Sequence, residues 1–122
     1  MSKYGFDIDG TLTRTSIARL ANELFQAGHE IHVITGALRD EGMWTISARE
    51  LQLKDLGVRY TELHRCFGDS LERIGAEKAK VCAGLGLVMM FEDSSTYIRH
   101  IGGKTLCCFV VNNPRNLSPA GT

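Results

Sequence analysis

Residues 3–13, KYGFDIDGTLT, join an apolar strand to a turn that carries two acidic side chains. Residues 3–8 have the aromatic and aliphatic side chains typical of a strand, and residues 9–11 have the composition of a turn. Asp7 and Asp9 therefore lie where the predicted strand ends. In doubly wound α/β proteins this position borders the ligand site, so the segment bears on both fold and function.

The order of strand and helix repeats along the rest of the chain. Apolar residues recur at helical spacing in several stretches, and short apolar runs lie between them. The predicted helices cover residues 16–27, 40–56, 76–85 and 94–101, and the predicted strands cover residues 3–8, 30–35, 58–63, 87–91 and 104–111. This alternation predicts an α/β, Rossmann-like, doubly wound fold, with a mainly parallel five-stranded sheet and helices on both faces. We expect residues 3–111 to form this single domain and residues 112–122 to form a coil tail.

Composition excludes several classes of protein without naming a function. The 122 residues carry 14 basic and 14 acidic side chains, and zero net charge argues against a chain built to bind polyanions. No apolar run approaches the roughly 18 residues of a membrane span, and we expect a soluble, cytoplasmic protein. The cysteines form no C-x-x-C pair, so reduced thiols are expected; they are Cys66, Cys82, Cys107 and Cys108.

Acidic side chains follow two of the predicted strands. Asp7 and Asp9 come after the first strand, and Glu92 and Asp93 come after the fourth. A turn and a helix cap would explain each pair singly, but not why both pairs end strands that are expected to be neighbours. Four carboxylates close together repel one another, so the cluster predicts a cation. Oxygen ligands of this kind suit Mg²⁺.

The segment Gly5–Thr13 resembles the first motif of the haloacid-dehalogenase superfamily of phosphohydrolases, an apolar strand followed by D-x-D-G-T-[LV]-[TS]. The family's second motif is a Thr or Ser that ends the second strand, and Thr35 corresponds to it. Its third motif is a lysine before the fourth strand, and its fourth motif is the acidic pair Glu92-Asp93. The resemblance covers residues 3 to about 111.

The resemblance implies covalent phosphoryl transfer. Asp7 would attack phosphorus and form an aspartyl-phosphate. Asp9 would protonate the leaving oxygen and then activate the water that hydrolyses the intermediate. Mg²⁺ would be held by Asp7, the backbone carbonyl of Asp9, Glu92 and Asp93. Which member of the acidic pair contacts the metal directly stays open, and Asp93 is favoured.

The resemblance also implies a set of phosphate contacts. The Thr35 hydroxyl and the Gly36 N–H would donate hydrogen bonds to the phosphoryl oxygens. The lysine that neutralises Asp7 and the phosphoryl group is either Lys78 or Lys80. Lys78 is favoured because it opens the predicted helix and precedes Glu92 by 14 residues.

The short connections predict an enzyme without a cap domain. Residues 10–15 and residues 64–74, the two places where the family inserts a cap, are too few to fold separately. An open site favours a substrate that covers the site itself, such as a phosphorylated macromolecule or a nucleic-acid end. Alternatively, a partner in a homo-oligomer supplies a lid over a phosphorylated small molecule. Candidate substrate contacts outside the motifs are Arg39, Trp44, His64 and Arg65.

The sequence therefore predicts a Mg²⁺-dependent phosphohydrolase that cleaves a phosphomonoester and has no membrane partner. A nucleic-acid 3′-phosphatase or a nucleotidase is the alternative within the same superfamily. A module that binds phosphate or a partner without catalysis is the alternative from another class. Loss of a motif residue would mark that module, and every motif residue is present.

Overall fold

A computed structural model describes residues 1–38 and 45–112. The strands are β1 (Lys3–Phe6), β2 (Glu30–Leu38), β3 (Glu62–Gly68), β4 (Met89–Glu92) and β5 (Cys107–Phe109), and the helices are α1 (Thr15–Gln26), α2 (Ile46–Leu56), α3 (Leu71–Leu85) and α4 (Ser95–Ile101). Among the described residues, five strands form one sheet in the order β3-β2-β1-β4-β5, and every neighbouring pair is parallel. The predicted α/β fold is confirmed.

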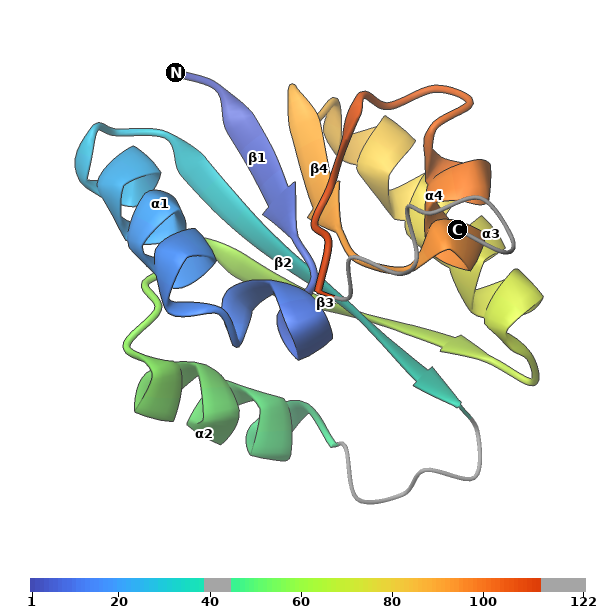
Figure 1. Ribbon diagram of the computed structural model, residues 1–122, viewed down its shortest axis with the longest axis horizontal. Coiled ribbons are helices and arrows are strands. Elements are labelled where there is room, and N and C mark those ends of the chain that lie inside the picture. The colour runs from blue at the N-terminus through green and yellow to red at the C-terminus, as the bar shows by residue number, and fades with distance from the viewer. Residues whose placement is uncertain (39–44, 113–122) are drawn as a thin grey trace, which may run out of the picture.

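Helices cover both faces of this sheet (Figure 1). Side chains alternate between the two faces along each strand, so one strand contributes to two cores. Val33 of β2 belongs to the core under α1 and α2, where the rings of Phe6 and Phe91 stack at 4.5 Å. Ile34 and Met90 belong to the core under α3 and α4. A one-residue slip would exchange the two sets, so burial on both faces fixes the register.

Local capping sets the ends of three helices. The hydroxyls of Thr45, Ser70 and Ser94 accept hydrogen bonds from first-turn N–H groups of α2, α3 and α4. Gly57 and Gly86 end α2 and α3 in the left-handed conformation that glycine tolerates best. The prediction that α3 begins near residue 76 is wrong, because the Ser70 cap starts the helix at Leu71.

The prediction of the third strand is also wrong in its bounds. Residues 58–61 connect α2 to the sheet: the Val58 N–H bonds back to the Leu53 carbonyl, which completes the turn after the helix. The Thr61 N–H then donates to the Ile31 carbonyl at 2.7 Å, and parallel pairing begins at Glu62. The predicted loop over residues 64–74 therefore holds most of β3 and the start of α3.

Strand β2 is longer than predicted. It continues three residues beyond Thr35 because β3 pairs with it as far as Leu38, which lies opposite Gly68. Thr35 is therefore inside the strand and not at its end. Residues 39–44 and 113–122, which include the candidates Arg39 and Trp44 and most of the predicted tail, lie outside the described residues.

The short connections agree with a fold that lacks a cap. In the described ranges, only Asp69 and Ser70 separate β3 from α3, and residues 7–14 separate β1 from α1. The connection after β1 holds one short helical turn, Ile8–Leu12, and neither connection holds a separate domain. No described helix combines the length and the apolar character needed to cross a membrane.

Candidate active site

The site forms where β1 and β4 end side by side. Phe6 lies opposite Phe91 in the register, and the Asp7 N–H donates to the Phe91 carbonyl at 3.0 Å. Asp7 directly follows β1, Glu92 is the last residue of β4, and Asp93 comes next. Parallel pairing thus brings three carboxyl groups to one edge of the sheet, as expected for a ligand site of this fold.

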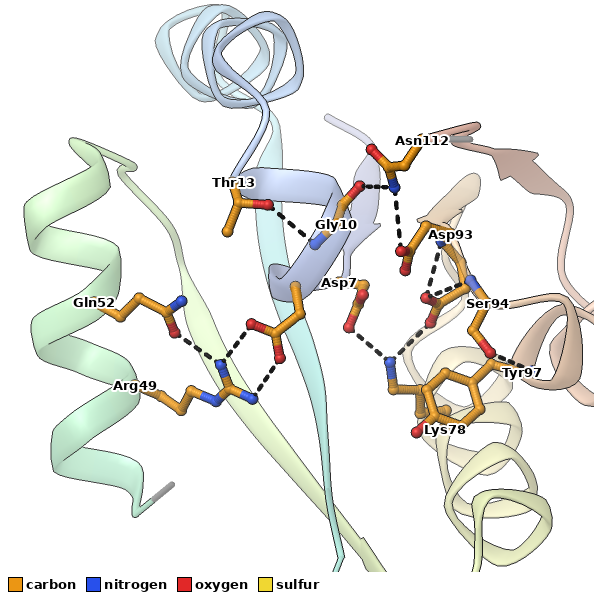
Figure 2. Close-up of polar contacts among 12 residues, drawn as sticks. Asp7, Gly10, Thr13, Arg49, Gln52, Lys78, Asp93, Ser94, Tyr97 and Asn112 are labelled. Carbon is orange, nitrogen blue, oxygen red and sulfur yellow. Dashed lines mark hydrogen bonds and ion pairs between the residues drawn. The ribbon is translucent and has the colours of Figure 1, made fainter. Parts of the chain in front are cut away.

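Lys78 of α3 reaches this edge and lies between two of the carboxylates (Figure 2). Its Nζ donates to Asp7 Oδ1 at 2.9 Å and to Glu92 Oε1 at 2.8 Å. The Lys78 side chain is fully buried, whereas that of Lys80 is 77% exposed and, among the described residues, pairs with Glu77 on its own helix. A buried ammonium is stable only with partners of opposite charge, and Lys78 has two.

Burial and like charge shift the ionisation of this cluster. Burial alone would lower the pKa of Lys78, but Asp7 and Glu92 more than offset it and hold this pKa above its ordinary value. Burial, followed by the charge of Asp7, raises the pKa of Glu92 to about 8. The same two causes raise the pKa of Asp93. A second cation that joins the cluster would favour the ionised carboxylates.

The two members of the acidic pair differ in their surroundings. Glu92 is fully buried, and its Oε2 accepts hydrogen bonds from the N–H groups of Asp93 at 3.0 Å and Ser94 at 3.3 Å. Asp93 is only half-buried. Asp7, Glu92 and Asp93 each offer an oxygen within 4.8 Å of the others. Hard oxygen ligands in this arrangement fit a magnesium ion, and Asp93 is the most accessible of them.

The turn after β1 packs directly on Asp93. Gly10 has φ +76°, and a Cβ there would lie 1.9 Å from Asp93 Oδ2, so a larger residue would have to displace the carboxylate. Asn112 Nδ2 donates to the Gly10 carbonyl at 2.7 Å and to Asp93 Oδ2 at 3.2 Å (Figure 2). Sequence reasoning placed Asn112 in the tail and missed this contact.

Asp9 faces a different partner. Its carboxylate accepts two hydrogen bonds from Arg49 of α2, one on Oδ1 at 3.1 Å and one on Oδ2 at 2.8 Å. Arg49 is 2% exposed and also donates to Gln52, whereas Asp9 is 62% exposed. Asp9 is not among the carboxylates whose oxygens lie within 4.8 Å of one another, so the predicted cluster of four carboxylates holds three among the described residues. Sequence reasoning missed Arg49; a basic residue within the predicted helix 40–56 was the available signal.

The remaining predicted contacts are divided between two regions. Gly36 lies close to Lys78, since a Cβ added there would be 3.7 Å from Lys78 Cε and 2.6 Å from Ile74. Thr35 is buried inside β2, and by alternation its side chain lies on the α1 and α2 face. His64 bonds to His32 within the sheet, and its partners do not include the acidic cluster.

Two further side chains have defined contacts, and only the first lies beside the site. The ring of Tyr97 lies 4.4 Å from Lys78 Nζ, a cation–π contact that sequence reasoning did not foresee. The Arg65 guanidinium lies over the ring of Phe67 at 4.1 Å, on β3.

Comparison with known proteins establishes the fold. No protein-family model and no curated protein matches this sequence. Two structures of Pnkp1/Rnl/Hen1 complexes, one described as an RNA repair complex, contain a chain that aligns with TM-score 0.67. Identity is 16% and 15%, over 91% and 93% of this chain but only 46% and 44% of those chains. This chain thus spans less than half the length of those two.

Two other solved structures align over most of both chains. A universal stress protein in complex with cAMP aligns with TM-score 0.54 and 9% identity over 89% of this chain and 97% of that one. D,D-heptose 1,7-bisphosphate phosphatase from Burkholderia thailandensis aligns with TM-score 0.46 and 14% identity, over 88% and 92%. At these identities the likeness concerns the fold alone, and the chemistry must be argued from the site.

Proposed function

We propose that this chain is a magnesium-dependent phosphohydrolase that cleaves a phosphomonoester through an aspartyl-phosphate on Asp7. The observation that carries the proposal is the Asp7–Lys78–Glu92 arrangement beside Asp93, at the carboxyl ends of β1 and β4. A turn or a cap does not require a buried lysine between two buried carboxyl groups. An oxygen-rich cluster with an ordered cation is, however, what phosphoryl transfer to a carboxylate needs.

The proposed reaction assigns a different task to each aspartate. Lys78 holds Oδ1 of Asp7, and we assign Oδ2 as the nucleophile. Its attack forms an O–P bond as the bond to the leaving oxygen breaks, and Asp9 supplies the proton that this oxygen needs. Asp9, now ionised, takes a proton from water as that water attacks phosphorus, which releases inorganic phosphate and restores Asp7.

Asp7, Asp93 and Glu92 would hold the magnesium ion, together with the backbone carbonyl of Asp9. When bound, magnesium supplies positive charge that offsets the repulsion between a carboxylate nucleophile and a phosphate dianion. Lys78 supplies a fixed positive charge at Oδ1 of Asp7. Gly36, beside Lys78, would offer its N–H to a phosphoryl oxygen. A contact from the Thr35 hydroxyl, which lies on the other face of β2, remains a prediction.

The substrate class has two candidates. A phosphorylated small molecule is one. A 3′-phosphorylated nucleic-acid end is the other, favoured by a site without a cap and by the shared fold with a chain of an RNA repair complex. A panel of sugar phosphates, mononucleotides and 3′-phosphorylated oligonucleotides separates the two by kcat/KM. A lid from a homo-oligomer, a single catalytic domain over residues 3–111 and a cytoplasmic location remain predictions.

The direct test is hydrolysis of p-nitrophenyl phosphate with magnesium present. We expect turnover in the parent chain and at least a 1000-fold loss in Asp7→Asn, which keeps the shape but removes the nucleophile, a loss of roughly 4 kcal/mol in transition-state stabilisation. Activity that survives in Asp7→Asn would refute the role of Asp7. Magnesium binding without turnover of any substrate in the panel would instead favour a non-catalytic phosphate-binding module.

A further inference from the structure

A second cluster of metal-ligating side chains lies on the sheet, apart from the acidic site. It consists of His32 of β2 with Glu62 and His64 of β3. In the register, His32 lies opposite Glu62, and Ile34 lies opposite His64, so the three side chains share one face of the sheet. Each offers one ligand atom within 4.8 Å of the other two. None of the three has a role in the proposed phosphatase reaction.

The distances suit a small ion with nitrogen ligands. His32 Nδ1 and His64 Nε2 are 3.0 Å apart, and His32 Nδ1 is 3.8 Å from Glu62 Oε1. A tetrahedral zinc ion with Zn–N bonds of about 2.0–2.1 Å separates its ligand atoms by about 3.3–3.4 Å. Shifts of a few tenths of an ångström would therefore place these atoms around such an ion.

Glu30 prepares His32 to act as a ligand. His32 Nε2 lies 2.9 Å from Glu30 Oε1. An ionised carboxylate only accepts hydrogen bonds, so Nε2 carries the ring proton and a neutral His32 presents the lone pair of Nδ1 to His64 and Glu62. A carboxylate that bonds to the far nitrogen of a histidine is the usual orienting partner in protein metal sites.

The cluster is both built into the fold and accessible. The His32 side chain is 1% exposed, so its ring is held firmly, whereas Glu62 is 61% exposed. Strand β3 is an edge strand of the sheet, so an ion can enter from solvent beside Glu62. Two carboxylates, from Glu30 and Glu62, surround the two imidazoles, and a divalent cation would neutralise them.

We propose that His32, His64 and Glu62 bind a divalent transition-metal ion of the zinc class, with water in a fourth position and Glu30 as the orienting partner. Imidazole ligands favour such ions over magnesium, so this site and the acidic site select different metals. The bound ion would join β2 to the edge strand β3 and stabilise that edge.

The test measures zinc binding to metal-stripped protein, with zinc alone as the probe and excess magnesium present to occupy the acidic cluster. Competition with a chelator measures the affinity. We expect one equivalent of zinc to bind and to raise the Tm of the protein. His64→Ala should weaken binding by more than about 100-fold, and Glu62→Ala by at least tenfold. Glu30→Gln should weaken it about 10–100-fold, as loss of an orienting partner does. These side chains are at least partly exposed, so the variants should fold, which circular dichroism checks.

His100→Ala is the matched control. His100 forms a pair with Glu72 at 2.6 Å, a histidine–carboxylate contact elsewhere on the surface, and its removal should leave zinc affinity unchanged. Cobalt can be bound in place of zinc, and its absorption spectrum then shows whether the ligands are nitrogen and oxygen atoms, as proposed, or thiolates. Failure to bind zinc, unchanged affinity in His64→Ala, or a thiolate-to-cobalt charge-transfer band would each overturn the proposal. The outcome does not depend on phosphatase activity.

Discussion

Lys78 links the stability of the protein to its proposed chemistry. The ammonium contacts Asp7 and Glu92 at hydrogen-bond distance in a fully buried position. Removal of one partner from a set of buried ion pairs leaves the remaining charges buried and unpaired. The resulting loss in the free energy of unfolding is far larger than the net stabilisation that the intact ion pairs provide. The same ammonium would stabilise negative charge on a transferring phosphoryl group. A single side chain therefore contributes to folding and, under the proposed function, would also contribute to catalysis.

Lys78→Met keeps most of the volume and removes the charge. We expect a loss of about 3–5 kcal/mol in the free energy of unfolding at pH 8, and a loss of activity of at least about 100-fold. Without Lys78, the two buried carboxyl groups of Asp7 and Glu92 face each other with no compensating positive charge, and burial together with the charge of Asp7 already raises the pKa of Glu92. Their ionisation then destabilises the fold as pH rises, so the deficit should shrink between pH 8 and pH 5.5.

Urea unfolding of both proteins at the two pH values checks this expectation. Lys80→Met is the matched control, because Lys80 is exposed on the same helix and should change stability by less than about 0.5 kcal/mol. A deficit in Lys78→Met that is equal at both pH values would contradict the electrostatic explanation.

Arg49 is the positioning residue for Asp9. It holds the Asp9 carboxylate through two hydrogen bonds and is itself buried in α2. If Asp9 delivers a proton to the leaving oxygen, Arg49→Met should lower kcat for an alkyl phosphate by roughly tenfold or more. The loss should be smaller for p-nitrophenyl phosphate, since nitrophenolate leaves without a proton. Equal losses on both substrates would indicate a purely structural role; Arg59→Met, at an exposed site, is the control.

At the scale of elements, the turn between β1 and α1 links the part of the site that follows β1 to Asp93, which follows β4. Gly10 is in the left-handed region with φ +76°, and its carbonyl accepts a hydrogen bond from Asn112. The same Asn112 bonds to Asp93. The turn after one strand therefore helps to fix the carboxylate that follows the next strand in the sheet.

Gly10→Ala should disturb both backbone and site. The left-handed conformation costs a non-glycine residue about 1–2 kcal/mol, and the added methyl would also displace Asp93. Gly57→Ala isolates the first effect, because Gly57 has φ +70° and no atom within 4 Å of its Cβ position. We expect similar backbone strain in both variants but weaker magnesium binding only in Gly10→Ala, measured by calorimetry. Equal magnesium affinity in the two would show that the turn does not position Asp93.

The type of the five strands and of helices α1 to α4 was predictable from sequence, but the short helical turn Ile8–Leu12 and the bounds that depend on sheet pairing were not. Glycines mark the C-terminal ends of α1 and α3 because this signal acts within a few residues, whereas the start of α3 was predicted near residue 76 instead of Leu71. The extension of β2 past Thr35 depends on pairing with β3, which no local pattern reports. The partners of Asp9 and Asp93 were hidden for the same reason: Arg49 and Asn112 are 40 and 19 residues away.

At the scale of the whole molecule, the two cores on either side of the sheet should unfold together. Cys66 and Cys82 are buried in the core beneath α3 and α4. Burial raises the pKa of the Cys66 thiol to about 11 and that of Cys82 to about 12, and the thiolate is the reactive form. Neither should react with iodoacetamide at pH 8 in the native protein.

Mass spectrometry of alkylated protein at rising urea concentrations checks this protection. Cys66 and Cys82 should become labelled together, at the midpoint of the circular dichroism transition, whereas half-buried Cys107 and Cys108 should be labelled earlier. Labelling of Cys82 well before the transition would show that the α3 side opens independently of the rest of the sheet.

The most direct test of the account is chemical capture of the intermediate on Asp7. Borohydride reduces an acyl phosphate to an alcohol, so a quench during turnover of p-nitrophenyl phosphate would convert a phosphorylated aspartate to homoserine. The Asp9→Asn variant should accumulate the intermediate. Nitrophenolate leaves the substrate without a proton, so the intermediate still forms, but the water that hydrolyses it has lost its base. Peptide mass spectrometry should then find homoserine at position 7, only with substrate and magnesium present. Turnover without homoserine there, or homoserine at position 93 instead, would contradict the central claim.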